Sequence, residues 1–221
     1  MKLRYRCLIL DHDDTAVNST ATIHYPAHLA ALEALRPGKS IPSLETWFLK
    51  NFEPGLMPYL QDELKMDSLE LKQEYLIWRE FTSSRVPSFY AGFLELLARY
   101  QRMGGLVTVV SHSESEFIAR DYRSGKPRVV PDMILGWNQD AGKRKPDPWP
   151  VRRILKQFGL EEGQALIVDD LKPGVMMARA AGVDIVAAGW GHSIQIIRDY
   201  MIANCSRYFS SIDELGAYLL S

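Results

Sequence analysis

Cysteine is scarce in this sequence, which has only Cys7 and Cys205 among its 221 residues. Neither cysteine stands in the CxxC spacing of a redox or metal site, and two cysteines cannot build a disulfide framework. Long apolar runs are missing as well, because the first apolar stretch already breaks at Asp11. We therefore expect neither a signal peptide nor a transmembrane helix, and the sequence indicates a soluble, cytoplasmic protein.

An excess of charge of one sign is also missing. The 26 Lys and Arg residues almost balance the 27 Asp and Glu residues, which leaves a net charge of -1. Proteins that bind nucleic acids or membrane surfaces generally carry a basic excess, so we expect neither partner. The hydrophobic content of 47% is enough for a packed core.

Short apolar runs alternate with helical patterns over most of the chain. The expected strands are Tyr5–Leu10, Leu106–Val110, Met133–Leu135, Ala165–Val168 and Val183–Ala187. The expected helices between them are Ala91–Arg102, Glu114–Asp121, Pro148–Phe158, Pro173–Ala181 and Ile194–Ala203. Apolar strands with little polar alternation are typical of parallel sheets that are covered on both faces. The order predicts an α/β fold with a doubly wound, Rossmann-like and mainly parallel sheet.

One long segment, residues 19–88, interrupts this alternation. It contains no convincing strand but shows helical patterns over Ala27–Leu35, Ser43–Lys50 and Ser68–Phe81. The sequence therefore predicts a core domain from residues 1–18 and 89–221, with residues 19–88 inserted as an all-helical cap. A cap of this kind would exclude water from a site and select its substrate.

The most informative segment, Asp11-His12-Asp13-Asp14-Thr15, directly follows the first expected strand. Three carboxylates within four positions repel one another unless a cation lies among them. Asp11 and Asp13 are two residues apart, so an extended chain points both to the same side. An acidic turn or a helix cap has the same local composition, and three later segments decide between these interpretations.

Two of these segments could hold an anion. Ser111 ends an expected strand and precedes a helical pattern, and such a junction presents a hydroxyl and N–H groups. A simple helix N-cap at Ser111 or Ser113 is the alternative. Lys145 is followed by Pro146 and Pro148, which stiffen the chain and hold the ammonium in place. A solvated basic loop is the alternative for this segment.

The third segment places Asp169 and Asp170 at the end of another apolar strand. Adjacent side chains diverge, so we expect one carboxylate to reach a metal ion directly and the other to act through water or a hydrogen bond. A pair of turn-forming aspartates is the alternative.

Together, the DxDxT loop, the strand-terminal Ser111, the KPDP segment and the Asp169-Asp170 pair resemble the haloacid dehalogenase (HAD) superfamily. The resemblance covers nearly the whole core and includes the turn Gly189-Trp190-Gly191-His192. The inserted helices resemble the C1-capped branch, with its phosphoglycolate phosphatase-like and β-phosphoglucomutase-like enzymes. Asp14 departs from the pattern, since relatives usually carry glycine there. Aspartate tolerates a positive φ better than most residues, so we expect the loop to survive.

The resemblance implies a role for each of these residues. Asp11 would be the nucleophile that forms an aspartyl-phosphate, and Asp13 would move protons as general acid and base. Mg²⁺ would be held by Asp11, the backbone carbonyl of Asp13 and Asp170, with Asp169 supporting or sharing this role. The remaining implied residues are Ser111, His112 and Lys145 for phosphate, Thr15 for loop support and Lys50 of the cap for substrate.

The presence of Asp13 favours phosphate-ester chemistry, because dehalogenases and phosphonatases of the superfamily lack an acid/base carboxylate there. We predict a Mg²⁺-dependent phosphatase for a small phosphorylated metabolite, as a monomer or weak homodimer. A phosphomutase of the β-phosphoglucomutase type is the alternative, because it uses the same residues. A non-catalytic binding protein with the same fold is a more distant alternative.

Overall fold

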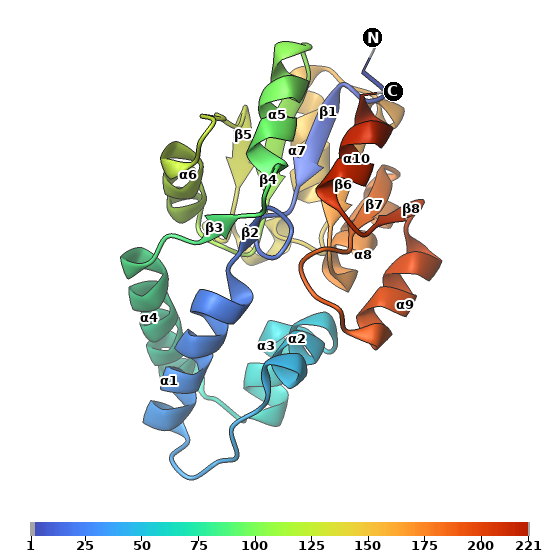
Figure 1. Ribbon diagram of the computed structural model, residues 1–221. Helices are drawn as coiled ribbons and strands as arrows, with labels where there is room; N and C mark the ends of the chain where they lie inside the picture. Colours follow the sequence, from blue (N-terminus) through green and yellow to red (C-terminus); the bar gives the residue numbers. More distant parts are fainter. Residues whose placement is uncertain (1–2, 221) are drawn as a thin grey trace. The chain divides into compact units, whose positions relative to one another are not determined.

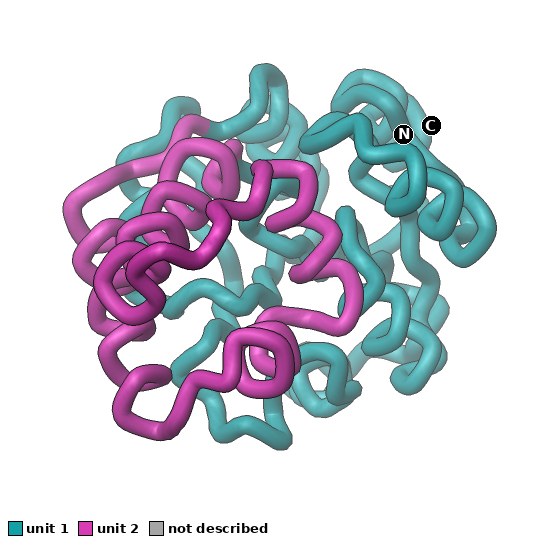
Figure 2. The backbone as a smooth tube through the Cα atoms, turned by 90° about the horizontal axis from the view of Figure 1, so that it is seen from below, with its two compact units in different colours: residues 1–17, 89–221 teal, residues 18–88 magenta. Residues whose placement is uncertain are grey.

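The computed structural model describes residues 3–220, and the chain divides into two compact units, which Figure 2 colours separately. The first unit comprises Met1–Val17 and Phe89–Ser221, and the second comprises Asn18–Ser88. The chain passes from one unit to the other at β2 (Val17–Asn18) and returns at β3 (Ser88–Phe89), and these two strands pair with each other. That the second unit acts as a cap stays a prediction.

A parallel sheet forms the centre of the first unit. Within residues 3–220 it has six strands in the order β5-β4-β1-β6-β7-β8. Their bounds are Cys7–Leu10 for β1, Leu106–Val110 for β4, Met133–Leu135 for β5, Ala165–Asp169 for β6, Asp184–Ala188 for β7 and Arg207–Phe209 for β8. The predicted α/β fold with a parallel sheet is confirmed, and β8 adds a strand that the sequence analysis omits.

Helices cover both faces of this sheet (Figure 1). Helices α5 and α10 pack on one face, and α7 and α8 lie on the other. The helices of this unit are α5 (Phe93–Arg102), α6 (Ser115–Ser124), α7 (Trp149–Phe158), α8 (Lys172–Ala181), α9 (Gln195–Asn204) and α10 (Ile212–Leu219). Short 3₁₀ turns cover Ala141–Lys143 and Glu162–Gln164. None of the helices in residues 3–220 combines the length and apolar character needed to cross a membrane.

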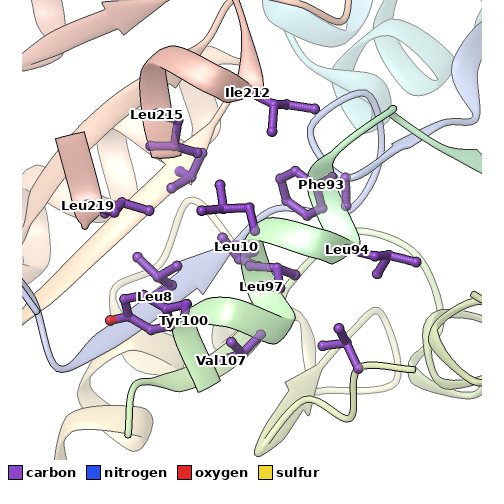
Figure 3. Close-up of a cluster of buried hydrophobic side chains, with 14 of the residues drawn as sticks. Leu8, Leu10, Phe93, Leu94, Leu97, Tyr100, Val107, Ile212, Leu215 and Leu219 are labelled. Atoms are coloured by element: carbon purple, nitrogen blue, oxygen red, sulfur yellow. The ribbon is translucent and has the colours of Figure 1, made fainter. Parts of the chain in front are cut away.

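Strand β1 is buried on both faces, which explains its unbroken apolar sequence. Leu8 and Leu10 belong to the cluster in which Leu97 of α5 and Leu215 of α10 also lie (Figure 3). Ile9 points to the opposite face, because side chains alternate along a strand, and it is buried as well. Burying one such side chain fully contributes roughly 1.5–3 kcal/mol, so β1 is firmly anchored. The backbone of Asp11, which directly follows β1, is therefore held in a fixed position.

The second unit is helical and has an apolar cluster of its own. Its elements are a π-helical turn over Thr20–His24, α1 (Tyr25–Leu35), α2 (Leu44–Phe52), α3 (Leu56–Pro58), a π-helical turn over Tyr59–Glu63 and α4 (Ser68–Ser84). Helix α1 packs against α4, and Leu32, Trp47 and Leu60 are part of the cluster. The Asp67 side chain caps the start of α4.

Candidate active site

Three buried aspartates meet at the carboxyl ends of the two central strands. Asp11 directly follows β1, Asp169 is the last residue of β6, and Asp170 comes next. One carboxylate oxygen from each lies within 4.8 Å of those of the other two. In the sheet, β1 lies between β4 and β6, and at this place the order of the strands along the chain changes direction. Ligands of such folds bind at the carboxyl ends of the strands at this place.

Lys145 inserts its ammonium among these carboxylates. Its Nζ lies 2.5 Å from Asp11 Oδ1 and 2.9 Å from Asp169 Oδ2, and the side chain is only 5% exposed. Burial by itself would lower the pKa of Lys145, but the two carboxylates outweigh burial and raise it. The lysine therefore remains a cation in the site.

The same charges act on the aspartates. Burial raises the pKa of Asp11, Lys145 opposes this rise, and Asp169 and Asp170 add to it. Burial likewise raises the pKa of Asp169, again against the effect of Lys145. Crowded buried carboxylates are costly without positive charge, and Lys145 offsets part of the cost of ionising them.

Asp13 faces a different set of partners. Its Oδ2 accepts hydrogen bonds from Ser111 Oγ at 3.0 Å and from Ser113 Oγ at 2.8 Å. The two serines follow β4, so Asp13 and Ser111 are brought together as neighbours. Asp11 and Asp13 thus lie in distinct environments, one against a cation and one among hydroxyl groups. Two carboxylates that differ in this way can take different roles in a reaction.

Thr15 supports the acidic loop by a contact with Asp170. Thr15 Oγ1 donates to Asp170 Oδ1 at 3.3 Å. The backbone carbonyl of Thr15 also accepts a hydrogen bond of 2.9 Å from the indole of Trp190. Thr15 therefore connects the loop after β1 with the end of β6 and with the turn after β7.

The side chain of His112 is hydrogen-bonded to the backbone of Lys145. Its Nε2 lies 2.8 Å from the Lys145 carbonyl oxygen. Burial, together with the charge of Lys145, lowers the pKa of His112 to about 4, so the ring is neutral at neutral pH. A carbonyl can only accept, so Nε2 carries the proton and donates it. The predicted contact of His112 with phosphate stays a prediction.

Asp14 is buried and adopts φ = +56°, in the left-handed region that favours glycine. The loop thus keeps the backbone geometry that the resemblance anticipates, with an additional carboxylate. His12 faces away from the site, since its Nε2 lies 3.1 Å from Asp121 Oδ2 and its ring packs near Tyr122.

Lys50 belongs to the second unit and is described there by itself. Its Nζ lies 2.5 Å from Glu63 Oε2 and 5.6 Å from the centre of the Tyr59 ring. These contacts hold the ammonium on the surface of that unit. A role of Lys50 toward substrate stays a prediction.

The carboxylate set fits a hard divalent cation. Asp170 Oδ2 is buried and accepts no hydrogen bond within residues 3–220, so its lone pairs are available. Both oxygens of Asp169 are engaged, one by Lys145 and the other by the backbone N–H of Leu171. The donor set therefore suits an ion held directly by Asp11 and Asp170, with Asp169 in support.

Ser113 and His192 are two residues near the acidic cluster to which the sequence analysis assigns no catalytic or binding role. Ser113 donates to Asp13, and His192 Nε2 lies 3.5 Å from Asp170 Oδ2. The Ser-x-Ser spacing after a strand is a usable signal for the first, because residues two apart can face the same way. Only the fold brings His192 to Asp170.

Gly174 is required where α8 starts beside Asp169. A Cβ at this position would lie 2.2 Å from Asp169 Oδ2. Gly174→Ala is therefore expected to displace the carboxylate from Lys145 and to destabilise the fold by roughly 1–3 kcal/mol. Denaturant unfolding measures this loss. Without the clash, alanine would stabilise a helical position.

Gly163→Ala is the matched control, because nothing lies within 4 Å of a Cβ there. Its effect is expected to stay within about 0.5 kcal/mol, as for ordinary surface substitutions. Equal stability of the two variants would show that Asp169 has room to move.

The chain also resembles known proteins over most of its length. The family model described as haloacid dehalogenase-like hydrolase matches residues 8–188. A phosphoglycolate phosphatase from Pseudomonas savastanoi pv. phaseolicola is 27% identical over 199 residues, which cover 85% of this chain and 71% of the relative.

Solved structures show the same fold. CbbY from Rhodobacter sphaeroides, in complex with phosphate, is 18% identical with a TM-score of 0.73, covering 98% of this chain and 100% of that chain. A variant of CbbY in complex with xylulose-1,5-bisphosphate also has 18% identity and a TM-score of 0.73, covering 97% of this chain and 99% of that chain. At this level of identity the similarity concerns the fold.

Proposed function

The chain belongs to the haloacid dehalogenase-like hydrolases, and on this premise we propose that it hydrolyses a small phosphate monoester through an aspartyl-phosphate. The observation that carries the proposal is the pairing of a buried Asp11, in contact with Lys145, with an Asp13 that two serine hydroxyls hold. These environments suit a nucleophile and a separate proton carrier.

Mg²⁺ is the cation that we propose for the site. Asp11, Asp170 and the backbone carbonyl of Asp13 would hold it, and Asp169 would support it. Oxygen ligands of this kind suit Mg²⁺. When bound, the ion neutralises the charge of the phosphate so that an anionic carboxylate can approach it.

In the first step, an Asp11 carboxylate oxygen forms a bond to phosphorus while the bond from phosphorus to the leaving oxygen breaks. Asp13 in its acid form gives its proton to the leaving oxygen, so the alcohol departs neutral. Lys145 and Ser111 would hold the phosphate oxygens, which spreads the negative charge of the transferring group.

In the second step, Asp13 is a carboxylate and takes a proton from a water molecule. The water oxygen attacks phosphorus, the bond from phosphorus to Asp11 breaks, and orthophosphate is released. Asp11 is again a carboxylate and Asp13 again an acid, so the cycle closes. The serine hydroxyls that hold Asp13 fix its direction in both steps.

A small phosphorylated metabolite is the proposed substrate class. The similarity to a phosphoglycolate phosphatase supports this class, as does CbbY with a bound sugar bisphosphate. Phosphoglycolate is therefore the first compound to test. A panel of sugar and carboxylic-acid phosphates extends the search.

Removal of divalent metal tests the proposal. We expect the protein with Mg²⁺ to release orthophosphate from an aryl phosphate and from at least one compound of the panel. Chelation is expected to lower this rate at least about 100-fold, because the ion contributes several kcal/mol to transition-state stabilisation. Added Mg²⁺ restores the rate.

Product analysis separates the proposal from its alternatives. Conversion of a sugar 1-phosphate into a sugar 6-phosphate, with no orthophosphate, would identify a mutase. Binding of phosphorylated compounds without any turnover would contradict the proposed reaction.

A further inference from the structure

We propose that His112 is a positioning residue for Lys145: it holds the backbone carbonyl of the lysine, so that the ammonium reaches the phosphate site at a fixed place. The inference rests on the proposed function, since Lys145 holds the transferring phosphate there. In this role His112 needs no contact of its own with the phosphate. It acts on the reaction only through the lysine.

Lys145 is held at both of its ends. Its Nζ lies 2.5 Å from Asp11 Oδ1 and 2.9 Å from Asp169 Oδ2. At the other end, its backbone carbonyl oxygen lies 2.8 Å from His112 Nε2. A lysine side chain is a flexible four-carbon stem, so the place of its ammonium depends on where its backbone is held. A displacement of about 1 Å in a group that positions a substrate can cost roughly 100-fold in rate.

The His112 ring is suited to this bond as a neutral donor. The carbonyl oxygen of Lys145 can only accept, and a neutral imidazole carries one N–H, so the proton lies on Nε2. Burial and the charge of Lys145 lower the pKa of His112 to about 4, which keeps the ring neutral at neutral pH. A neutral donor holds the backbone without placing a second positive charge beside the ammonium.

The segment 111–113 holds two groups of the proposed mechanism at once. Ser111 Oγ and Ser113 Oγ donate to Asp13 Oδ2 at 3.0 Å and 2.8 Å. His112, which lies between the two serines in the sequence, donates to the carbonyl of Lys145. Three consecutive residues after β4 therefore set the proposed proton carrier and the lysine relative to each other. Phosphoryl transfer depends mainly on such placement of the groups around the phosphate.

Trp137, which follows β5, contacts the His112 ring and the residue before the lysine. The rings of Trp137 and His112 meet edge to face, with their centroids 5.9 Å apart and an angle of 88° between their planes. The guanidinium of Arg144 lies over the Trp137 ring, 3.9 Å from its centre. Trp137 is itself fixed, because its backbone N–H donates to the Ser113 carbonyl at 2.8 Å. The hydrogen bond between His112 and Lys145 is therefore supported from both of its sides.

The experiment measures kcat/KM for an aryl phosphate at saturating Mg²⁺. His112→Leu removes the donor and is expected to lower kcat/KM about 10- to 100-fold, because the ammonium is then misplaced. His112→Gln places an amide N–H near the position of Nε2 and is expected to restore most of this loss. Equal kcat/KM for the wild type and His112→Leu would overturn the inference. Equal losses for His112→Leu and His112→Gln would overturn it as well, since they would indicate that the ring only fills space.

A double-variant cycle separates this role from a direct contact of His112 with phosphate. Lys145→Met removes the ammonium, so the further change His112→Leu is expected to lower kcat/KM by less than about 3-fold in this background. Such non-additivity is the sign that His112 acts through Lys145. The same loss in both backgrounds would mean that His112 acts on the phosphate by itself, and would overturn the inference. If Lys145→Met does not fold, Lys145→Gln takes its place in the cycle.

The same four proteins give a readout that needs no turnover. In denaturant unfolding, His112→Leu is expected to lower the free energy of unfolding less in the Lys145→Met background than in the wild type, because the contacts of the ammonium are already lost there. Equal losses in the two backgrounds would indicate a merely structural hydrogen bond and would overturn the inference. If His112→Leu does not fold, His112→Asn replaces it, because its shorter side chain does not reach the carbonyl that His112→Gln reaches.

The two proposals fail in different ways. The proposed function fails if the wild type lacks Mg²⁺-dependent phosphate release, and the unfolding cycle then still decides whether His112 positions Lys145. The inference alone fails if that activity is present while the effects of the His112 and Lys145 variants are additive.

Discussion

Asp11→Asn is expected to abolish phosphate release almost completely, with a fall in kcat of roughly 10⁴-fold or more. The amide occupies the same space at the end of β1 but is a poor nucleophile toward phosphorus. It also removes one of the crowded carboxylates, while Lys145 keeps Asp169 as a partner. We therefore expect folding to be preserved and the chemical step to be lost. Orthophosphate release from an aryl phosphate at saturating Mg²⁺ measures the change.

Asp213→Asn is the matched control, since Asp213 is an exposed aspartate of α10 and is not part of the buried acidic cluster. Its turnover is expected to equal that of the wild type. Similar rates for Asp11→Asn and Asp213→Asn would rule out Asp11 as the nucleophile. Equal melting temperatures for the two variants would show that any loss of rate is chemical.

Lys145→Met is expected to reduce both stability and activity. The ammonium is buried between Asp11 and Asp169, and its removal leaves two carboxylates facing each other. Breaking a buried ion pair in this way costs about 3–5 kcal/mol. In the proposed mechanism Lys145 also holds the transferring phosphate, and losing one such group is expected to lower kcat by roughly 10²- to 10³-fold. Urea unfolding and phosphate release measure the two effects.

The pH dependence of Lys145→Met distinguishes electrostatics from packing. Without Lys145, burial raises the pKa of Asp11 and Asp169 unopposed, so the folded state binds protons more tightly than the unfolded state. The loss of stability is then smallest near the ordinary pKa of an aspartate, about 4, and grows as pH rises. A loss that does not change with pH would indicate packing alone.

Lys143→Met is the control for this variant. Lys143 lies two residues earlier, is 43% exposed and pairs with Asp140. Exposed ion pairs contribute about 0.2–1 kcal/mol, so a small effect is expected. A loss as large as that of Lys145→Met would contradict the importance of burial.

The central strands could be predicted because their sequences carry a strong and simple signal. A strand that is buried on both faces, such as β1 or β6, must be largely apolar; Asp11 directly follows β1, and Asp169 is the last residue of β6. Strands β4 and β5 have the predicted bounds. The predicted bounds of β7 are shifted by one residue, since Asp184 begins the strand and is exposed.

The last strand and helix are missing from the prediction for different reasons. Strand β8 has three residues, of which only Phe209 is buried, so no pattern distinguishes it from a loop. Helix α10 does carry a signal, because Ser211 caps it and Ile212, Leu215 and Leu219 recur on one face. This helix could have been predicted from its sequence.

The candidate site divides in the same way. Asp11, Asp13 and Asp170 follow apolar strands, and Lys145 directly precedes a segment stiffened by prolines, so their types and positions are visible in the sequence. His192 has no such signal, since a histidine in a glycine-rich turn has many uses. Its closeness to Asp170 depends on β7 lying beside β6, which only the folded sheet shows.

The pairing of β2 with β3 has a consequence for the evolution of the molecule. The segment Asn18–Ser88 begins and ends in two strands that pair with each other, so its two ends lie side by side. The distance between these ends therefore stays nearly the same whatever is inserted there. Exchanging the insertion for a longer or shorter one changes the closure entropy only slowly with its length. The segment can therefore be replaced as a module, while the strands that carry the aspartates keep their register.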